Sequence, residues 1–288
     1  MNGRRKRTYK SRRKGKSPDY RKMIISFLWL AVVLIILFFI GRYFINENFA
    51  ESKNADKISE FGNLQEVKLA SDMTEEIHEY TGYTVYFNST LHIPNCVSYE
   101  ITKDETMGKV PRYKNFEKDP NFANSASPMD YTNSGYDRGH MAPAADMKWD
   151  RDAMRESFYM SNVCPQNKSL NTGAWHKLEN KVREWAERDS AIMVVCGPVL
   201  SDIIEKIGNN EVAVPSKFFK IILAPYAQHP RAIAFLYNNE KCKGEMKKYV
   251  VTVDSIESLT GYDFFSSLPD VMENKVERTS NINEWNQR

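Results

Sequence analysis

The residues best suited to chemistry lie in the middle of the chain, in two groups. In the first group, the permanent cation Arg138 has a planar fork of donors that suits phosphate oxygens, and His140 can act as a general base near neutral pH. Gly139, between them, allows a backbone turn or the close approach of a ligand. In the second group, the amide of Asn171 and the carboxylate of Glu179 offer oxygen ligands for a hard, hydrated cation. Taken alone, these residues fit either catalysis on a phosphate or an ordinary turn beside a surface histidine.

A longer pattern surrounds these residues and favours catalysis. It consists of three blocks in a fixed order: Tyr136-Asp-Arg-Gly-His-Met-Ala-Pro-Ala-Ala-Asp146, Tyr159-Met-Ser-Asn-Val-Cys-Pro-Gln166, and Leu170-Asn-Thr-Gly-Ala-Trp175 with Leu178-Glu179. In order and spacing, the blocks closely resemble the DNA/RNA non-specific endonucleases, the family of ββα-metal nucleases that includes endonuclease G. The resemblance extends from about Tyr83 to Pro269.

The resemblance implies a role for each residue of a nuclease site. His140 matches the family's general base, and Asn171 matches its one direct protein ligand to Mg²⁺, with Mn²⁺ as a substitute. Glu179 falls where the family holds the waters of the metal ion, and Arg112 matches an arginine that stabilises the pentacoordinate transition state. Three further active-site positions are matched by Arg138, Asn162 and Arg183.

Simpler interpretations of several residues remain open. Glu179 and Arg183 are four residues apart and also fit an exposed helix pair worth about 0.3–0.5 kcal/mol. Asn171, before Thr-Gly, also fits a turn or the start of a helix. Asp137 is the carboxylate nearest to His140 in sequence, but neighbouring strand residues point to opposite faces, so we assign it a structural role. The remaining histidines lack paired metal spacing, which argues against a zinc site.

The predicted function is that of a Mg²⁺-dependent, sugar-non-specific endonuclease that hydrolyses phosphodiester bonds in DNA and RNA. The alternative is a nucleic-acid-binding or DNA-uptake factor that has the same fold but does not cleave. Because His140, Asn171 and Glu179 are all present, the enzyme is favoured. Activity is expected to fall as the pH decreases through the titration range of imidazole, since a protonated base accepts no proton. The sequence allows a homodimer without fixing the oligomeric state.

The N-terminal region predicts a single-pass anchor in the inner (cell) membrane. Residues 1–22 hold eleven basic residues and one acidic residue, and the nineteen residues 23–41 are apolar and uncharged. A helix of this length comes close to spanning the ~30 Å hydrocarbon layer. The charge asymmetry places the N-terminus in the cytoplasm and the catalytic domain in the periplasm or outside the cell. The alternatives are a signal peptide cleaved near Ala50 and a nucleic-acid-binding role for the basic tail.

Beyond this tail the chain is acidic. The whole chain carries a net charge of +3 and its first 22 residues carry +10, which leaves −7 for residues 23–288. Phosphate binding must then depend on a local basic cluster, so affinity should be modest and strongly salt-dependent. The residues expected in this cluster are Arg112, Lys114, Arg138, Lys148, Lys168, Lys177 and Arg183. Such a charge distribution suits a hydrolase, which must release its product, better than a DNA-packaging protein.

Strands and helices that could position the site alternate along the rest of the chain. Strand-like runs rich in β-branched and aromatic residues occur at 83–87, 97–101, 192–196, 218–223 and 232–237. Helical patterns occur at 150–160 and 175–188. We therefore expect one α+β domain, with a central antiparallel sheet flanked by helices, over residues 75–275. The resemblance implies the same fold. A polar linker is expected at 42–74 and a C-terminal tail at 276–288.

Three further sets of residues bear on the core. Trp149, Trp175 and Trp185 are expected to be buried rather than to stack on bases. Residues 255–265 are expected to form a helix that packs its aromatic side chains on the sheet. The four cysteines contain no CxxC pair and leave three disulfide pairings open, and Cys196 also suits a buried free thiol. These cysteines are Cys96, Cys164, Cys196 and Cys242.

Overall fold

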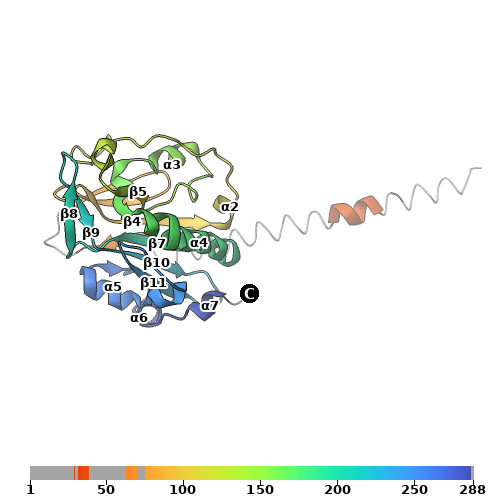
Figure 1. Ribbon diagram of the computed structural model, residues 1–288. Helices are drawn as coiled ribbons and strands as arrows, with labels where there is room; N and C mark the ends of the chain where they lie inside the picture. Colours follow the sequence, from red (N-terminus) through yellow and green to blue (C-terminus); the bar gives the residue numbers. More distant parts are fainter. Residues whose placement is uncertain (1–28, 30–31, 39–62, 70–74, 287–288) are drawn as a thin grey trace, which may run out of the picture. The chain divides into compact units, whose positions relative to one another are not determined.

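The chain divides into two units, one ending at Asp56 and the other beginning at Lys57. The computed structural model describes residues 29, 32–38, 63–69 and 75–286. In the first unit, residues 32–38 are helical (Figure 1). Within the described residues, no helix is both long and apolar enough to span a membrane. The tail predicted at 1–22 lies outside the described residues, as does most of the anchor predicted at 23–41.

A mostly buried antiparallel sheet forms the centre of the second unit (Figure 1). In the described part of the chain its strand order is β12-β11-β10-β7-β4-β3-β2. The strands are β2 (Glu76–Glu79), β3 (Thr84–Asn88), β4 (Ile93–Thr102), β7 (Ala191–Pro198), β10 (Lys217–Ala224), β11 (Arg231–Asn238) and β12 (Val250–Val251). The runs predicted from the sequence are confirmed as β3, β4, β7, β10 and β11. The α+β architecture is therefore confirmed for this unit.

The central strands are buried on both faces, which explains their continuous apolar sequences. Along β7, Ile192 and Val194 contribute to one hydrophobic cluster, whereas Met193 and Val195 contribute to the other. Because side chains alternate along a strand, a slip of one residue would exchange the two sets, so each apolar run fixes its own register. Figure 1 shows α3 and β5 on one side of the sheet and α5 and α6 on the other.

One face of the sheet is covered by α5 (Val253–Thr260), α6 (Asp270–Arg278) and a small sheet of β1 (Val67–Lys68) and β13 (Asp263–Phe264). The helix predicted at 255–265 ends earlier than expected. Gly261, with a φ of 76°, terminates α5 in the left-handed conformation, and the chain then enters β13. The predicted aromatic packing is confirmed, since Tyr262, Phe264 and Phe265 are buried in this cluster.

The boundaries predicted for the domain are too narrow at both ends. Within the linker predicted at 42–74, Val67 pairs with Phe264, and its amide donates to the hydroxyl of Tyr86 at 2.9 Å. Residues 276–286 are not a tail, because they complete α6 and form α7 (Ile282–Asn286). Trp285 is only 1% exposed and packs on Trp185, with ring centroids 4.8 Å apart. Both ends therefore contribute to the cores.

The other face of the sheet carries β5 (Tyr136–His140), β6 (Val163–Asn167), α3 (Arg151–Glu156), the π-helix η3 (Leu170–Trp175) and α4 (His176–Asp189). The helices predicted at 150–160 and 175–188 are confirmed with changed limits. The first stops at Glu156, and the second is preceded by η3. Strands β5 and β6 pair antiparallel and, with α4, form a ββα unit. The remaining described elements are α2 (Lys103–Thr106), η1 (Pro128–Tyr131), η2 (Met160–Asn162), β8 (Ile203–Ile207), β9 (Val212–Pro215) and η4 (Met246–Tyr249).

The expected core residues are largely confirmed. Trp175 and Trp185 are buried, and Trp149 is partly buried against the same cluster. All four cysteines are free thiols, and Cys96, Cys164 and Cys196 are buried. The alternative of a buried thiol at Cys196 is the one that the structure supports.

Candidate active site

A pocket of about 590 Å³ opens where β5, η3 and α4 meet. It is lined by residues that lie far apart in the sequence, and the ββα unit brings them together. The predicted site residues in its lining are Arg112, Arg138, His140, Asn171 and Glu179. Asp137, His176 and Phe116 also line it, although the sequence did not assign them to the site. The sequence therefore predicted the main polar residues of this pocket.

Strand β5 delivers Arg138 and His140 to the pocket, and Gly139 lies between them without forming a turn. A Cβ at Gly139 would lie 2.2 Å from Oε1 and 2.7 Å from Cβ of Gln166, a fully buried residue of β6. The expectation that Gly139 permits a turn is therefore wrong. The glycine instead allows the side chain of Gln166 to pack against β5, which fixes the strand that ends at His140.

The imidazole of His140 is held in a largely apolar setting. Its ring centroid lies 5.1 Å from that of Phe116 and 5.0 Å from that of Phe158. Its Nε2 atom is buried and has no hydrogen-bond partner among the described residues. Burial, followed by the positive charge of Arg112, lowers the pKa of His140 to about 3. The ring is therefore neutral at physiological pH and has a nitrogen free to accept a proton.

Asn171 lies on the π-helix η3, where the widened backbone is a form often found at functional sites. Its Nδ2 atom donates to Oδ2 of Asp137 at 3.0 Å. Because the amide nitrogen is engaged in this way, the orientation of the side chain is fixed and its carbonyl oxygen remains available as a ligand. Asp137 thus supports the site directly. Its role is the structural one assigned from the sequence, but the side chain that it orients is that of Asn171.

Glu179 extends from the first turn of α4 into the pocket and is 12% exposed. On the adjacent face of α4, Leu178, Val182 and Trp185 are buried and fix the helix on the sheet. His176, one turn before, places Nδ1 at 3.5 Å from a carboxylate oxygen of Glu179. Its hydrogen bond to Glu179 raises the pKa of His176. The pocket therefore contains two histidines whose pKa values are shifted in opposite directions.

Two arginines add positive charge to the pocket. Arg138 stacks over the ring of Phe116, with its Cζ 5.5 Å from the centroid, and donates to the carbonyl of Pro128 at 2.6 Å. Arg112 stacks over Phe158 at 5.0 Å. Aromatic stacking orders the guanidinium planes while leaving donors free for an anionic group. This arrangement suits the oxygens of a phosphate.

Two predicted site residues do not line the pocket. The side-chain amide of Asn162 is fully buried. It accepts a hydrogen bond from the backbone amide of Ala142 and donates one to the carbonyl of Ala142, both at 2.8 Å, and it also donates to the carbonyl of Ser157. Arg183 pairs with the buried carboxylate of Asp146. The polar atoms of both side chains thus already bond other groups of the protein. Asn162 therefore secures the segment after His140, and Arg183 secures α4, without contacting the pocket.

A buried cation behind the pocket was missed by the sequence reasoning. Lys220 of β10 is fully buried; its Nζ lies 3.3 Å from the carbonyl of Met141 and 4.6 Å from the ring centroid of Trp175. The indole of Trp175 in turn donates to the carbonyl of His140 at 3.3 Å. These contacts connect the end of β5 to the end of η3. A lysine inside the apolar run 218–223 was the signal available in the sequence.

The pocket residues fit a hard divalent cation. The amide oxygen of Asn171 and the carboxylate of Glu179 are oxygen donors, and no cysteine lines this pocket. Oxygen ligands without thiolates suit Mg²⁺ or Mn²⁺ rather than zinc. With a neutral imidazole and two arginines in the same pocket, the arrangement can activate a water next to a bound phosphate.

These features define a phosphodiesterase-type site on an α+β domain, and comparison with known proteins identifies the family. The sequence profile of the DNA/RNA non-specific endonuclease family matches residues 61–271. The chain therefore belongs to that family. The predicted resemblance is confirmed, and the matched segment contains every predicted site residue.

Relatives from distant organisms share this region. The mitochondrial nuclease EXOG of Mus musculus is 33% identical over 212 residues, which cover 67% of this chain and 58% of the mouse protein. The nuclease of Serratia marcescens is 36% identical over 203 residues, or 65% of this chain and 74% of that protein. Among solved structures, that of the EndoG/EndoGI complex matches with a TM-score of 0.67 and 26% identity, covering 78% of this chain and 94% of the matched chain. The chain thus spans less than two thirds of the EXOG sequence that it resembles.

Proposed function

We propose that the chain is a metal-dependent endonuclease that hydrolyses phosphodiester bonds of DNA and RNA in the pocket around His140. The observation that carries the proposal is the convergence of a neutral histidine, an oriented amide ligand and two arginines in one pocket. A binding protein needs the arginines alone. The neutral, unpartnered imidazole is required only for catalysis.

In this proposal each residue has a separate task. Arg112 and Arg138 bind the non-bridging oxygens of the scissile phosphate. The imidazole of His140 accepts a proton from the attacking water, which lies in line with the leaving 3′ oxygen. Asn171, oriented by Asp137, and Glu179 would hold Mg²⁺, directly and through its waters respectively. When bound, the ion supplies Lewis-acid stabilisation of the phosphoryl and leaving oxygens.

The proposal is tested against the alternative of a non-cleaving binding or uptake factor. The full-length chain, purified in detergent, is incubated with supercoiled plasmid and with RNA, in Mg²⁺ and after EDTA. We expect repeated turnover of both substrates in Mg²⁺, loss after EDTA, recovery when Mg²⁺ or Mn²⁺ is restored, and slower cleavage at high salt. Binding without turnover in Mg²⁺ would support the binding factor, and full activity in EDTA would exclude the metal.

The acid limb of the pH profile should lie well below the range of free imidazole. A base must be neutral to act, and the pKa of His140 is lowered to about 3, so the ring stays neutral as the pH falls past its ordinary value of about 6.5. Neutralising Arg112 removes one of the two causes of this shift. In Arg112→Gln, kcat/KM should therefore begin to fall at a higher pH than in the wild type, whatever its maximum.

The matched control for this pH prediction is Lys114→Gln, which removes an exposed positive charge from the same segment. Its acid limb should coincide with that of the wild type. A wild-type limb near pH 6.5, unchanged by Arg112→Gln, would contradict the assigned environment of His140. From the sequence, activity was expected to fall through the ordinary titration range of imidazole. Because burial lowers the pKa of His140, the loss is now expected at a lower pH.

The proposal includes a location. The charge asymmetry around residues 23–41 supports a single-pass anchor with a cytoplasmic N-terminus and the nuclease domain in the periplasm or outside the cell. Protease added to spheroplasts should then degrade the domain while sparing a tag at residue 1. A protected domain would refute this orientation, and a soluble product that begins near residue 51 would indicate cleavage instead.

A further inference from the structure

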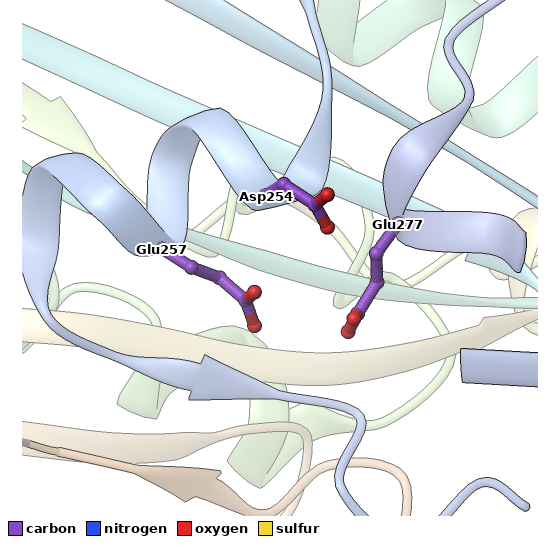
Figure 2. A group of neighbouring side chains, drawn as sticks. All are labelled: Asp254, Glu257 and Glu277. Atoms are coloured by element: carbon purple, nitrogen blue, oxygen red, sulfur yellow. The ribbon is translucent and has the colours of Figure 1, made fainter. Parts of the chain in front are cut away.

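We propose that Asp254, Glu257 and Glu277 bind a calcium ion on the face of the sheet opposite the candidate active site. The three carboxylates come from two helices, α5 and α6, that cover this face. One ligand oxygen from each residue lies within 4.8 Å of the others. Figure 2 shows that their side chains converge on one space between the helices.

The buried carboxylate of Glu277 is the strongest indication of a ligand. Its residue is only 8% exposed, and its Oε1 atom is buried without a hydrogen-bond partner among the described residues. In Figure 2 its carboxylate points towards those of Asp254 and Glu257. A buried charge without a partner is costly, so such a group requires either a proton or a cation.

Among the described residues, no ion pair includes Asp254, Glu257 or Glu277. The nearby Lys68 is paired with Asp263, at 3.6 Å. A bound cation would remove this unfavourable concentration of negative charge.

The identity of the ion follows from the ligands and their spacing. Three carboxylates with no histidine or cysteine select a hard cation. Ca²⁺ bonds oxygen at about 2.3–2.6 Å and accepts irregular arrangements of six to eight ligands. Two oxygens bonded to one Ca²⁺ can therefore lie up to about 5.2 Å apart, which covers the whole 4.8 Å range of this cluster, whereas Mg²⁺, at about 2.0–2.1 Å, spans at most about 4.2 Å and requires a regular octahedron. The site should thus prefer Ca²⁺.

Binding would connect the N-terminal part of α5 to the C-terminal part of α6. Asp254 and Glu257 lie one turn apart on α5, and Glu277 is next to the last residue of α6. Glu257 is already held in place, because its Oε1 accepts from the amide of Phe264 at 2.9 Å. The ion would stabilise the packing of both helices on the sheet and would have no part in the chemistry of the pocket.

The test uses thermal unfolding of the full-length chain in detergent, with Asn171→Ala as the parent so that the candidate active site contributes little. At a Ca²⁺ concentration about 100-fold above Kd, the Tm should rise by roughly 5 °C relative to EDTA, and equal Mg²⁺ should raise it much less. Adding Asp254→Asn and Glu277→Gln should abolish the Ca²⁺ response. The near-isosteric Glu277→Gln removes a buried charge, so the variant should remain folded in EDTA.

The charge-matched control adds Asp263→Asn and Glu273→Gln to the same parent. It removes two neighbouring carboxylates and should retain the Ca²⁺ response. If the double triad variant fails to fold, Asp254→Asn alone should still weaken the response. The proposal is overturned if Ca²⁺ leaves the Tm of the parent unchanged, or if it raises the Tm of the triad and control variants equally. Nuclease activity does not enter this readout, so the two proposals can fail separately.

Discussion

Replacing His140 by alanine is expected to lower the cleavage rate by at least ~10²–10⁴-fold, the usual contribution of a general base. DNA binding should change little, because the phosphate contacts are assigned to Arg112 and Arg138. The protein should remain folded, since truncation of this residue at the end of β5 leaves the backbone contacts of the strand intact. Single-turnover cleavage, DNA affinity and Tm, measured on one preparation, separate these three effects.

The matched control for this variant is His229→Ala, which removes an exposed histidine outside the pocket. It should cleave at the wild-type rate. Imidazole added to His140→Ala should restore part of the activity, because it supplies the missing group from solution, and should leave the control unchanged. A folded His140→Ala protein that cleaves within a few-fold of the wild type would remove His140 from the mechanism.

Replacing Asn171 by alanine should increase the Mg²⁺ concentration needed for half-maximal activity by more than the ~10–100-fold typical of losing a group that only supports a ligand. The reason is that Asn171 provides the amide oxygen proposed as the direct protein ligand. Asp137→Ala keeps this ligand but removes the oxygen that orients it at 3.0 Å. Its Mg²⁺ midpoint should therefore lie between those of the wild type and Asn171→Ala.

A Mg²⁺ titration of the cleavage rate tests this order. The control is Glu187→Ala, which removes an exposed carboxylate from the same helix as Glu179 and should leave the midpoint unchanged. An Asn171→Ala protein with the Mg²⁺ midpoint of the wild type would refute the assigned ligand. Equal midpoints for Asp137→Ala and the wild type would leave Asn171 in place but remove the orienting role of Asp137.

The central strands could be predicted because strands that are buried on both faces consist of long apolar runs, as in β7 and β10. Strands β5 and β6 could not be found in this way. The positions of β5 that line the pocket are polar because function requires polar side chains there. Strand β5 therefore lacks the apolar pattern from which a strand is predicted. Strand β8 has a weak pattern for a different reason, since three consecutive residues, Ile204, Glu205 and Lys206, are exposed and no alternation of buried and exposed positions results.

The site was predicted from matched motifs, and its exceptions show what a motif leaves out. A motif specifies residue type and order, but it does not show which polar atoms are already hydrogen-bonded to the surrounding protein. The amide of Asn162 is used entirely by backbone groups, and the guanidinium of Arg183 by Asp146 and Asn180. Conversely, the contact from Asp137 to Asn171 joins residues far apart in the sequence, and no local periodicity encodes it.

The predicted domain limits failed where short segments add to a core built mainly by others. Val67 and Trp285 are each buried within a largely polar stretch. A single apolar residue gives no periodic signal, and its burial depends on partners such as Phe264 and Trp185 elsewhere in the chain. Only the folded arrangement reveals those partners.

The central claim is that the His140 pocket hydrolyses phosphodiester bonds by activating water, independently of the sugar. Its most direct test is cleavage of one DNA and one RNA oligonucleotide in ¹⁸O-labelled water with Mg²⁺, followed by mass spectrometry of the new ends. We expect one ¹⁸O atom on the terminal phosphate of both products, with a free 3′ hydroxyl on the other fragment. RNA products ending in an unlabelled 2′,3′-cyclic phosphate, or the absence of cleavage of either substrate, would contradict the claim.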